Sequence, residues 1–557
     1  MDRRSFLRGA GALLGTAVAG ATVSACGGGA ATPTAGRPGQ RRRTARQVSV
    51  HDVDGLPVAD WLVEENRRPG TPPARWVVRP VPSPAGYPAP IEGYADQVSY
   101  VHGDEVRLQV NTAAASFRAE VYRVGYYQGN GARLVATTGD RPGKVQAIPS
   151  PAGGVNLIEC RWPTSVGLEV GPGWAPGQYL VLLVGSGGER HYVPFTVRDD
   201  ASTAAFAVQS SVATWQAYNL WGGYSLYGGA PSGALADRAR VVSFDRPYRG
   251  PDTQGSGDFL GNELPFVYLA ERLGLDVTYW TDLDLHARPE LLRRHRCLVS
   301  LGHDEYWSWQ MRFDGAAAAL AEGCNLLFLG ANACYRQIRL APSASGVADR
   351  RVICYKDYAA DPIDRTDPKL ATGSSWATDA PGYQYPESEL IGSMYRAYGA
   401  SAPLVVADAS SFVFAGTGLR DGDVVRGAAG NDVVGSEFDA FEPGLPGPRN
   451  VDVLCHSPTD SVVGQGYSDL TYYSHAGGGA VLDTGTARWV ELLWDGSRPL
   501  QGALSFGRSP ARATLTAVTL NVLRAFGAGP AGRRHPSSGT WRRFYTAAGP
   551  VPVPVEA

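Results

Sequence analysis

Apolar and polar residues alternate with a period of two from about Trp76 to Arg198. Residues 105–110 and 119–124 alternate in this way, while residues 179–184 form a continuous apolar run. Turn residues separate these segments at Gly103-Asp104, Gly129-Asn130-Gly131 and Pro176-Gly177. Short strands punctuated by turns predict a β-sandwich of the immunoglobulin type over residues 61–200.

The rhythm changes after Asp200, where apolar strands begin to alternate with helix-length segments. Strands are expected at residues 277–280, 297–302 and 325–330, each preceded by a helix: one ending near Gly274, one through residues 291–294 and one from Ala316 to Glu322. This β-α-β-α-β order predicts a mostly parallel sheet flanked by helices over residues 201–545. Residues 340–430, rich in Pro, Gly and Ser, are expected to form long loops over a site.

The N-terminus has the pattern of an export signal. Arg3 and Arg4 precede a short uncharged apolar stretch that ends at Cys26, in a sequence resembling a bacterial lipobox. The stretch is too short to cross a bilayer as a stable helix, so a single uncleaved span is the weaker alternative. We expect residues 1–26 to be a twin-arginine signal peptide and residues 27–60 a flexible linker. The mature protein would then be lipid-anchored to the outer face of the cytoplasmic membrane.

Charge and cysteine usage narrow the classes of partner. The formal net charge of −2 provides no electrostatic footprint for nucleic acid, so we expect no nucleic-acid partner. Beyond Cys26 there are six cysteines, without a CxxC pair or metal-finger spacing. Export would permit disulfides, but the spacing does not define their pairing.

Chemically active side chains follow two of the predicted strands. The loop after Gly302 begins His303-Asp304-Glu305-Tyr306, and the loop after Gly330 contains Asn332, Cys334 and Tyr335. Ligands of parallel sheets bind outside the carboxyl ends of the strands, so the two phenols could face each other there.

Several ordered segments resemble the large-subunit family of N,N-dimethylformamidase. The resemblance runs from Glu65-Asn66 to a predicted helix at residues 517–526. The matching segments are Gly125-Tyr126-Tyr127 through Gly131-Ala132-Arg133, Trp215 to Asn219, Gly222 to Tyr227, Phe244 to Tyr248, the two loops after Gly302 and Gly330, Gly435 to Asp439, Gly478 to Val481 and Thr484 to Thr486. The fold class expected is therefore α/β, with a sheet of the glutamine amidotransferase or flavodoxin type after the sandwich.

The resemblance implies a mononuclear ferric iron held by two tyrosinates and a glutamate, and the hydrolysis of an amide bond. By position the ligands would be Tyr306, Tyr335 and Glu437. Anionic oxygen ligands suit such an ion, because a strong cation is needed to ionise a phenol whose free pKa is about 10. The open positions would hold an activated water and the carbonyl of a small-molecule substrate.

The resemblance also suggests catalytic side chains and one departure from the family. Asn332, His303 and His475 are candidates to stabilise the oxyanion or to carry a proton to the leaving amine. Ser474 stands where the family has a glutamate, so the catalytic base differs or is absent. The family's small subunit has no counterpart within this chain, and the oligomeric state is open.

Two other functions remain open from the sequence. Cys334 follows a strand by four residues, so a thiol nucleophile activated by a histidine is one alternative, although the flanking glycines of a nucleophile elbow are missing. The other is a non-catalytic binding protein of the cell envelope on the same fold.

Overall fold

The computed structural model describes residues 48–78, 89–250, 255–496, 508–547 and 549–554. The signal peptide expected at residues 1–26 lies outside these ranges. Part of the expected linker is ordered, because residues 50–59 form a β-hairpin. Across the described ranges, no helix combines the length and the apolar character needed to cross a membrane.

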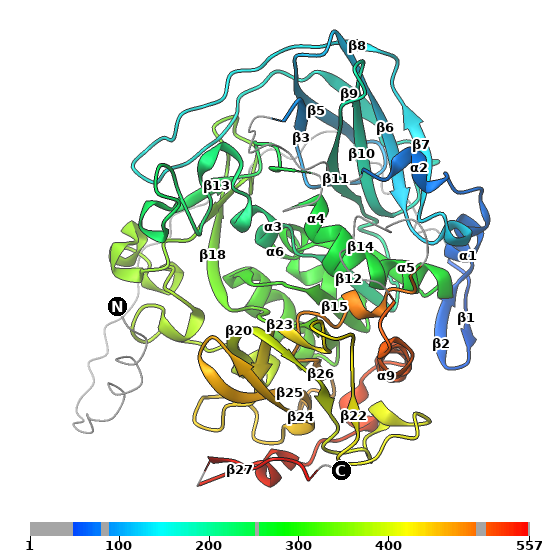
Figure 1. The fold of residues 1–557 in the computed structure, drawn as a ribbon, viewed down its shortest axis with the longest axis vertical. Helices are drawn as coiled ribbons and strands as arrows, with labels where there is room; N and C mark the ends of the chain where they lie inside the picture. The colour runs from blue at the N-terminus through cyan, green and yellow to red at the C-terminus, as the bar shows by residue number, and fades with distance from the viewer. Residues whose placement is uncertain (1–47, 79–88, 251–254, 497–507, 548, 555–557) are drawn as a thin grey trace, which may run out of the picture. The chain divides into compact units, whose positions relative to one another are not determined.

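Two β-sheets pack against each other through a common apolar core in the N-terminal half (Figure 1). One sheet is antiparallel and holds β3 (Ile91–Ala95), β5 (Glu105–Thr112) and β9 (Val166–Glu169). The other has β4 (Ser99–Tyr100), β11 (Arg190–Val197), β10 (Gly177–Gly185), β6 (Ser116–Val124) and β7 (Ala132–Thr137) in this order, with β8 (Arg141–Pro142) paired to β6. In β5, Val106 and Leu108 enter the core while Glu105 and Arg107 are exposed, which is the alternation that predicted this strand.

A seven-stranded mixed sheet follows. Its order is β14 (Val277–Thr281), β12 (Phe206–Ser210), β15 (Cys297–Gly302), β17 (Asn325–Gly330), β26 (Ala480–Asp483), β25 (Gly464–Ser474) and β24 (Asp452–Ser461). The first five strands pair in parallel, whereas β26, β25 and β24 pair antiparallel. The sequence predicted the parallel part. The tight turn between β24 and β25 permits only an antiparallel pair, so the sheet is mixed.

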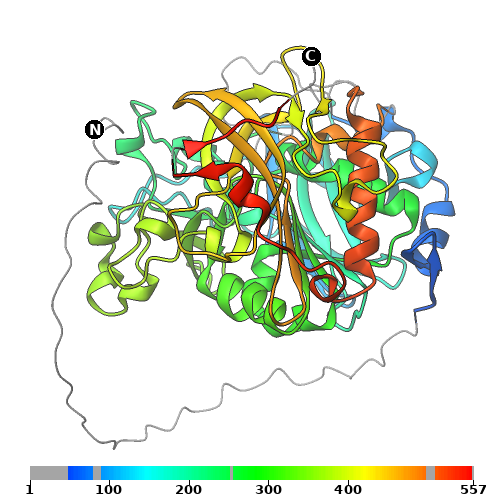
Figure 2. The ribbon, with the colours of Figure 1, turned by 90° about the horizontal axis from the view of Figure 1, so that it is seen from below.

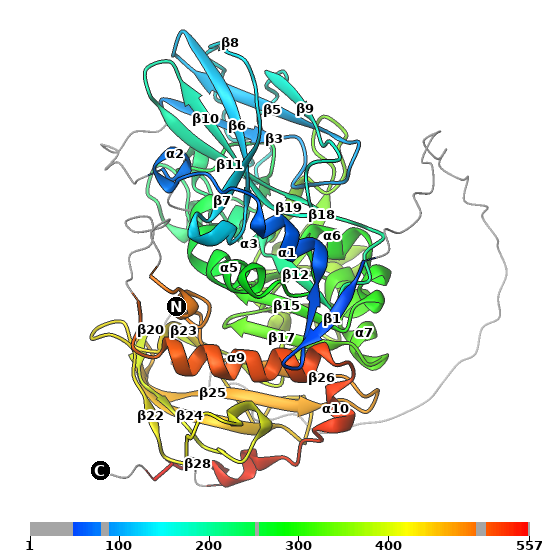
Figure 3. The same cartoon turned by 90° about the vertical axis from the view of Figure 1, so that its right-hand side faces the viewer.

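The predicted helices are present with altered forms. α5 (Leu264–Leu273) ends at Gly274, whose φ of 66° gives the left-handed C-cap that favours glycine. Residues Pro289–Arg294 form a 3-10 helix. The third predicted helix divides into a π-helix, Gln310–Ala317, and α7 (Ala318–Ala321). α9 (Arg512–Gly527) contains the predicted residues 517–526 and lies beside the mixed sheet (Figures 2 and 3).

Residues 340–430 contain more regular structure than the predicted loops. β19 (Arg351–Ile353) pairs with β18 (Arg336–Ala341) and β13 (Val241–Ser243). β20 (Met394–Ala402) pairs with β23 (Val434–Ala440). The remaining strands and α-helices are β1 (Val50–Val53), β2 (Leu56–Ala59), β16 (Tyr306–Ser308), β21 (Leu404–Val405), β22 (Val424–Val425), β27 (Tyr545–Thr546), β28 (Gly549–Pro550), α1 (Asp60–Arg67), α2 (Pro73–Trp76), α3 (Val212–Tyr218), α4 (Ser256–Asp258), α6 (Asp282–Ala287), α8 (Ser388–Ile391) and α10 (Ala531–Arg534).

A buried ion pair joins the sandwich to the helical layer of the mixed sheet. Arg123 on β6 donates to Glu271 on α5 from both terminal nitrogens, at 2.7 and 2.9 Å, and both side chains are fully buried. Asn66 and Tyr279 also donate to the Glu271 carboxylate, at 2.8 and 2.9 Å. This network fixes α5, and with it the sheet, against the sandwich.

The buried side chain of His295 makes the unfolding free energy of the protein depend on pH. Burial lowers the pKa of His295 to about 4, while its Nδ1 lies 2.7 Å from the carbonyl oxygen of Ala204. The unfolded chain therefore binds a proton below pH 6.5 that the folded chain takes up only near pH 4, and stability falls as the pH decreases through this window.

Replacing His295 with Asn removes the titration and keeps a side-chain N–H donor. Between pH 7.5 and 4.5 we expect the wild-type protein to lose roughly 2 to 3 kcal/mol more unfolding free energy than His295→Asn, since each pKa unit corresponds to about 1.4 kcal/mol. Urea unfolding of both proteins at the two pH values measures this difference. The other titrating groups are the same in both proteins, so their contributions cancel. Equal losses in the two proteins would show that His295 is not held neutral.

Candidate active site

The two loops singled out from the sequence meet at the carboxyl ends of β15 and β17. These strands end level with each other, because Gly302 pairs with Gly330. A Cβ at Gly330 would lie 1.9 Å from the carbonyl oxygen of Gly302, so only glycine allows this approach. Beyond the glycines, β16 pairs in parallel with β18, and Tyr306 lies opposite Arg336.

Glu305 is the centre of the resulting side-chain cluster. Its buried carboxylate accepts hydrogen bonds from the hydroxyls of Tyr218 (2.6 Å) and Tyr227 (2.7 and 2.8 Å) and from Nε of Arg336 (2.6 Å). Burial alone would raise the pKa of Glu305, but Arg336 and then His303 outweigh it and hold the pKa below its usual value. Glu305 is therefore a permanent anion within the protein.

Three phenols are linked beside this anion. Tyr306 donates to the Tyr227 hydroxyl at 2.8 Å, the hydroxyl oxygens of Tyr218 and Tyr227 lie 2.9 Å apart, and the rings of Tyr218 and Tyr227 stack with centroids 4.3 Å apart. Burial, followed by the charge of Glu305, raises the pKa of Tyr306 well above 10. Without a bound cation, Tyr306 is a neutral hydroxyl.

Tyr335 contacts the cluster through Arg336. The Arg336 guanidinium carbon lies 4.9 Å from the centre of the Tyr335 ring, and the ring of Tyr395 on β20 lies 5.2 Å from it. Burial raises the pKa of Tyr335, and Arg336 partly opposes this rise. Arg336 therefore contacts both of the tyrosine-bearing loops.

His303, Asn332 and Glu437 form a second group next to Glu305. Asn332 Nδ2 donates to Glu437 at 2.8 Å and lies 3.1 Å from Nε2 of His303. The same imidazole nitrogen lies 3.4 Å from a carboxylate oxygen of both Glu437 and Glu305. Burial lowers the pKa of His303, but Glu437 and then Glu305 outweigh burial and raise it to about 9. With side chains 19% and 21% exposed, His303 and Glu437 are reachable from solvent.

Lys356 adds a second cation to the cluster. Its ammonium nitrogen lies 3.2 Å from the centre of the Tyr227 ring and 5.7 Å from that of Tyr306. Burial, followed by Arg336, lowers the pKa of Lys356 to about 7. Lys356 was not predicted as a site residue, and neither were the roles of Tyr218, Tyr227, Glu305 and Arg336. The one available signal was the density of tyrosines between residues 218 and 227.

The structure separates two of the predicted catalytic residues from this cluster. Ser474 pairs with Ala480 at the start of β26, and His475 occupies the turn between β25 and β26. The backbone nitrogen of Ala480 donates to Asn325, the first residue of β17, whereas the cluster follows the last. Ser474 and His475 therefore lie at the opposite edge of the sheet, and the expectation that they take part is corrected.

The thiol alternative is not supported by its surroundings. All six described cysteines are unpaired and buried. Burial raises the pKa of Cys334 to about 12, so almost none of it is thiolate at neutral pH. A thiol nucleophile needs a lowered pKa, which is the opposite of the shift at Cys334.

The donor set determines which metal the cluster could hold. In the described part of the chain, no group of three or more His, Cys, Asp or Glu side chains is arranged to hold a metal ion. A metal here would therefore depend on the phenols of Tyr306 and Tyr335 together with Glu437. These are hard oxygen donors, which suit a ferric ion. The ion brings three positive charges and the two phenols lose one proton each, so the cluster gains only one positive charge. The residues present fit such an ion chemically.

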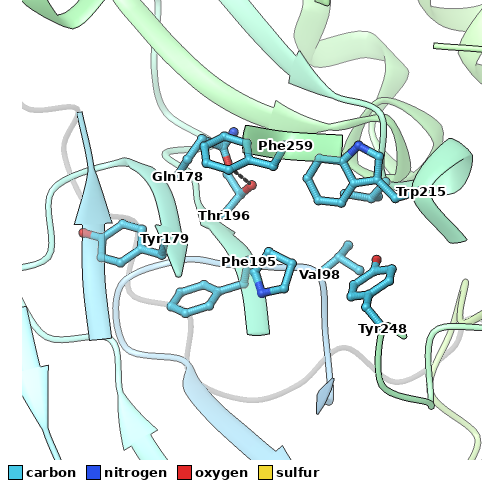
Figure 4. Close-up of a pocket in the computed structure, with 10 residues that line it drawn as sticks. Val98, Gln178, Tyr179, Phe195, Thr196, Trp215, Tyr248 and Phe259 are labelled. Carbon is cyan, nitrogen blue, oxygen red and sulfur yellow. Dashed lines mark hydrogen bonds between the residues drawn. The ribbon is translucent and has the colours of Figure 1, made fainter. Parts of the chain in front are cut away.

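A small cavity lies elsewhere, between the sandwich and the segments that carry α3 and Phe259 (Figure 4). Its walls include Gln178, Thr196, Trp215, Tyr248 and Phe259. Thr196 donates to Gln178 at 2.7 Å, as the dashed line shows. A volume of about 10 Å³ holds roughly one water, so this cavity does not accept a substrate.

Comparisons with known proteins agree with the resemblance drawn from the motifs. The chain is 24% identical to the N,N-dimethylformamidase beta subunit of Paracoccus aminophilus over 296 residues, and 24% identical to that of Alcaligenes sp over 300 residues. Each match covers 46% of this chain and only 38% of the relative. The match to a solved structure of an uncharacterized protein from Bacillus anthracis str. Ames has 10% identity and covers 19% of this chain and 82% of that protein; its TM-score of 0.13 does not indicate a shared fold.

A family model provides the wider match. The model described as N,N-dimethylformamidase beta subunit-like, C-terminal, matches residues 118–499. This range includes β15, β17 and every residue of the cluster around Glu305. The chain belongs to the N,N-dimethylformamidase beta subunit-like family.

Proposed function

We propose that the protein hydrolyses small amides or related C–N bonds at the cluster around Glu305. The observation that carries this proposal is the cluster around one buried anion, Glu305. The reachable His303 lies beside Glu305 and Glu437, Tyr306 is linked to Glu305 through Tyr227, and Tyr335 lies against its ion-pair partner Arg336. Membership of a family whose curated relatives are named N,N-dimethylformamidase beta subunit supports the reaction class.

We also propose that Tyr306, Tyr335 and Glu437 hold a mononuclear ferric ion. When bound, such an ion would polarise the amide carbonyl and lower the pKa of a water molecule. Within the protein, Glu305 and Arg336 hold the two loops in register, so that the tyrosines are presented from neighbouring strand ends. Preorganisation of this kind lowers the cost of binding both ion and substrate.

His303 is the proton carrier in this proposal. Its Nε2 faces Glu437 and Glu305, and it is exposed enough to meet a leaving amine. Asn332 holds the Glu437 carboxylate through Nδ2, and its own backbone nitrogen is fixed by two hydrogen bonds to Asp439, at 2.9 and 3.1 Å. Asn332 therefore orients Glu437, while His303 delivers the proton from Nε2.

A panel of short formamides and acetamides tests the reaction. The purified protein should release amine and carboxylic acid in equal amounts, and His303→Gln should reduce kcat by roughly 100-fold or more, the usual contribution of a proton-transferring group. His51→Gln, which changes an exposed histidine on the β1–β2 hairpin, should leave the rate unchanged. Failure to cleave any amide would favour the non-catalytic binding protein instead.

We propose that Arg3 and Arg4 direct export and that Cys26 carries the lipid, because the sequence has the pattern of an export signal.

The relatives are named as beta subunits, which supports a partner subunit for this chain too. The facing sheets of the N-terminal half support an immunoglobulin-type sandwich, and the parallel part of the mixed sheet supports a glutamine amidotransferase or flavodoxin-type fold.

A further inference from the structure

Basic side chains gather on one flank of the phenol cluster. The Arg336 guanidinium carbon and the Lys356 nitrogen lie over the same Tyr227 ring, at 5.8 and 3.2 Å from its centre. Arg238 donates from Nη2 to the carbonyl of Tyr355, the neighbour of Lys356, at 2.9 Å. The backbone of Arg240 pairs with the same segment, since its carbonyl accepts the N–H of Cys354 at 2.9 Å, and its charge acts on Arg238. Positive charges from three chain segments thus meet at one place.

Two donors of this basic flank lack an acceptor. Nζ of Lys356 and Nε of Arg238 are buried without a hydrogen-bond partner. Arg336, by contrast, has Glu305 for its Nε and a backbone carbonyl of Ser374 for a terminal nitrogen. Buried cationic donors without partners are costly, so their persistence beside a reactive cluster points to an acceptor that arrives with a ligand.

The nearby carboxylates do not supply this acceptor. Glu305 is already occupied by two phenols and Arg336, and Glu437 is occupied by Asn332 and His303. Asp357 is exposed, and its Oδ1 caps the following turn by accepting from the backbone of Ala359. Like charges dominate instead: burial and then Arg240 lower the pKa of Arg238.

We propose that Lys356 and Arg238 form an anion subsite, and that the preferred substrates are small amides that carry a carboxylate. Two separate N–H donors match the two oxygens of a carboxylate. The flexible stem of Lys356 allows its enclosed ammonium to leave the Tyr227 ring and meet the incoming anion. This specificity rests on the amide-hydrolysing function proposed above, whereas anion binding itself does not.

Binding and turnover of a matched pair of ligands test the subsite. Titration calorimetry and initial rates would compare N-formylglycine with the neutral N-formylglycinamide. We expect the wild-type protein to bind N-formylglycine at least ten times more tightly, with kcat/KM favouring it by a similar factor. Lys356→Met should reduce both ratios to near one, and Lys356→Arg should restore much of the preference.

Lys369→Met is the matched control, because Lys369 is exposed and lies over Trp309 rather than over the Tyr227 ring. It should retain the wild-type preference. The subsite is overturned if the wild-type protein does not prefer the anion, or if folded Lys356→Met and Lys356→Arg both keep that preference. Charge-dependent binding without any hydrolysis would instead reject the amidase function and leave the subsite standing.

Discussion

The Tyr306→Phe variant is expected to lose bound iron and at least roughly 100-fold in amide hydrolysis. The change removes one oxygen and keeps the ring that fills the core, where Tyr306 is fully buried. Tyr227 retains its hydrogen bonds to Glu305, so the fold should be affected by no more than about 1 kcal/mol. A loss of two to three kcal/mol in transition-state stabilisation corresponds to this change in rate.

Metal analysis and a steady-state assay on the same preparation measure both effects of Tyr306→Phe. Tyr224→Phe is the control, because the Tyr224 hydroxyl is bonded to the carbonyl of Ala230 at 3.1 Å, outside the cluster. It should keep wild-type iron and activity. If Tyr306→Phe behaves in the same way as Tyr224→Phe, Tyr306 is a core residue and not a ligand.

The Glu271→Gln variant is expected to lose about 3 to 5 kcal/mol of unfolding free energy. The neutral amide takes away the carboxylate that is directly paired with the buried guanidinium of Arg123, and breaking a buried pair from one side costs this much. Denaturant unfolding monitored by tryptophan fluorescence measures the loss. Glu64→Gln, an exposed carboxylate on α1 nearby, should change stability by less than about 0.5 kcal/mol.

A loss below about 1 kcal/mol in Glu271→Gln would contradict this account of the junction. It would mean that the other acceptors of Arg123, the hydroxyl of Tyr127 and the carbonyl of Pro176, accommodate the guanidinium without the carboxylate charge. Comparison with Arg123→Met separates the two partners, because removing the cation instead leaves the carboxylate unpaired.

The central strands could be predicted from the sequence because they are buried on both faces. Residues 297–302 and 325–330 are continuous apolar runs, and the structure places β15 and β17 over the same residues. β12 escaped notice because its five residues, Phe-Ala-Val-Gln-Ser, are too short for a period to emerge. The segment at 289–294 shows why helix type is harder to predict, since six residues starting with Pro settle into 3-10 geometry.

The site was only partly predictable, because side-chain partners come from distant segments. The loop at 303–306 stood out by its density of functional groups, but nothing local marked Glu305 as its centre. Its partners Tyr218 and Tyr227 lie 87 and 78 residues away along the chain, and only the fold unites them. Ser474 failed as a candidate because strand direction and register decide which edge of the sheet a residue occupies.

The iron content and visible absorption of the purified full-length protein test the central claim most directly. We expect about one iron per chain, together with a tyrosinate-to-iron absorption band that disappears in Tyr306→Phe and persists in Tyr224→Phe. Active protein that contains no stoichiometric iron and lacks this band would contradict the proposal that Tyr306, Tyr335 and Glu437 form a metal-dependent hydrolytic site.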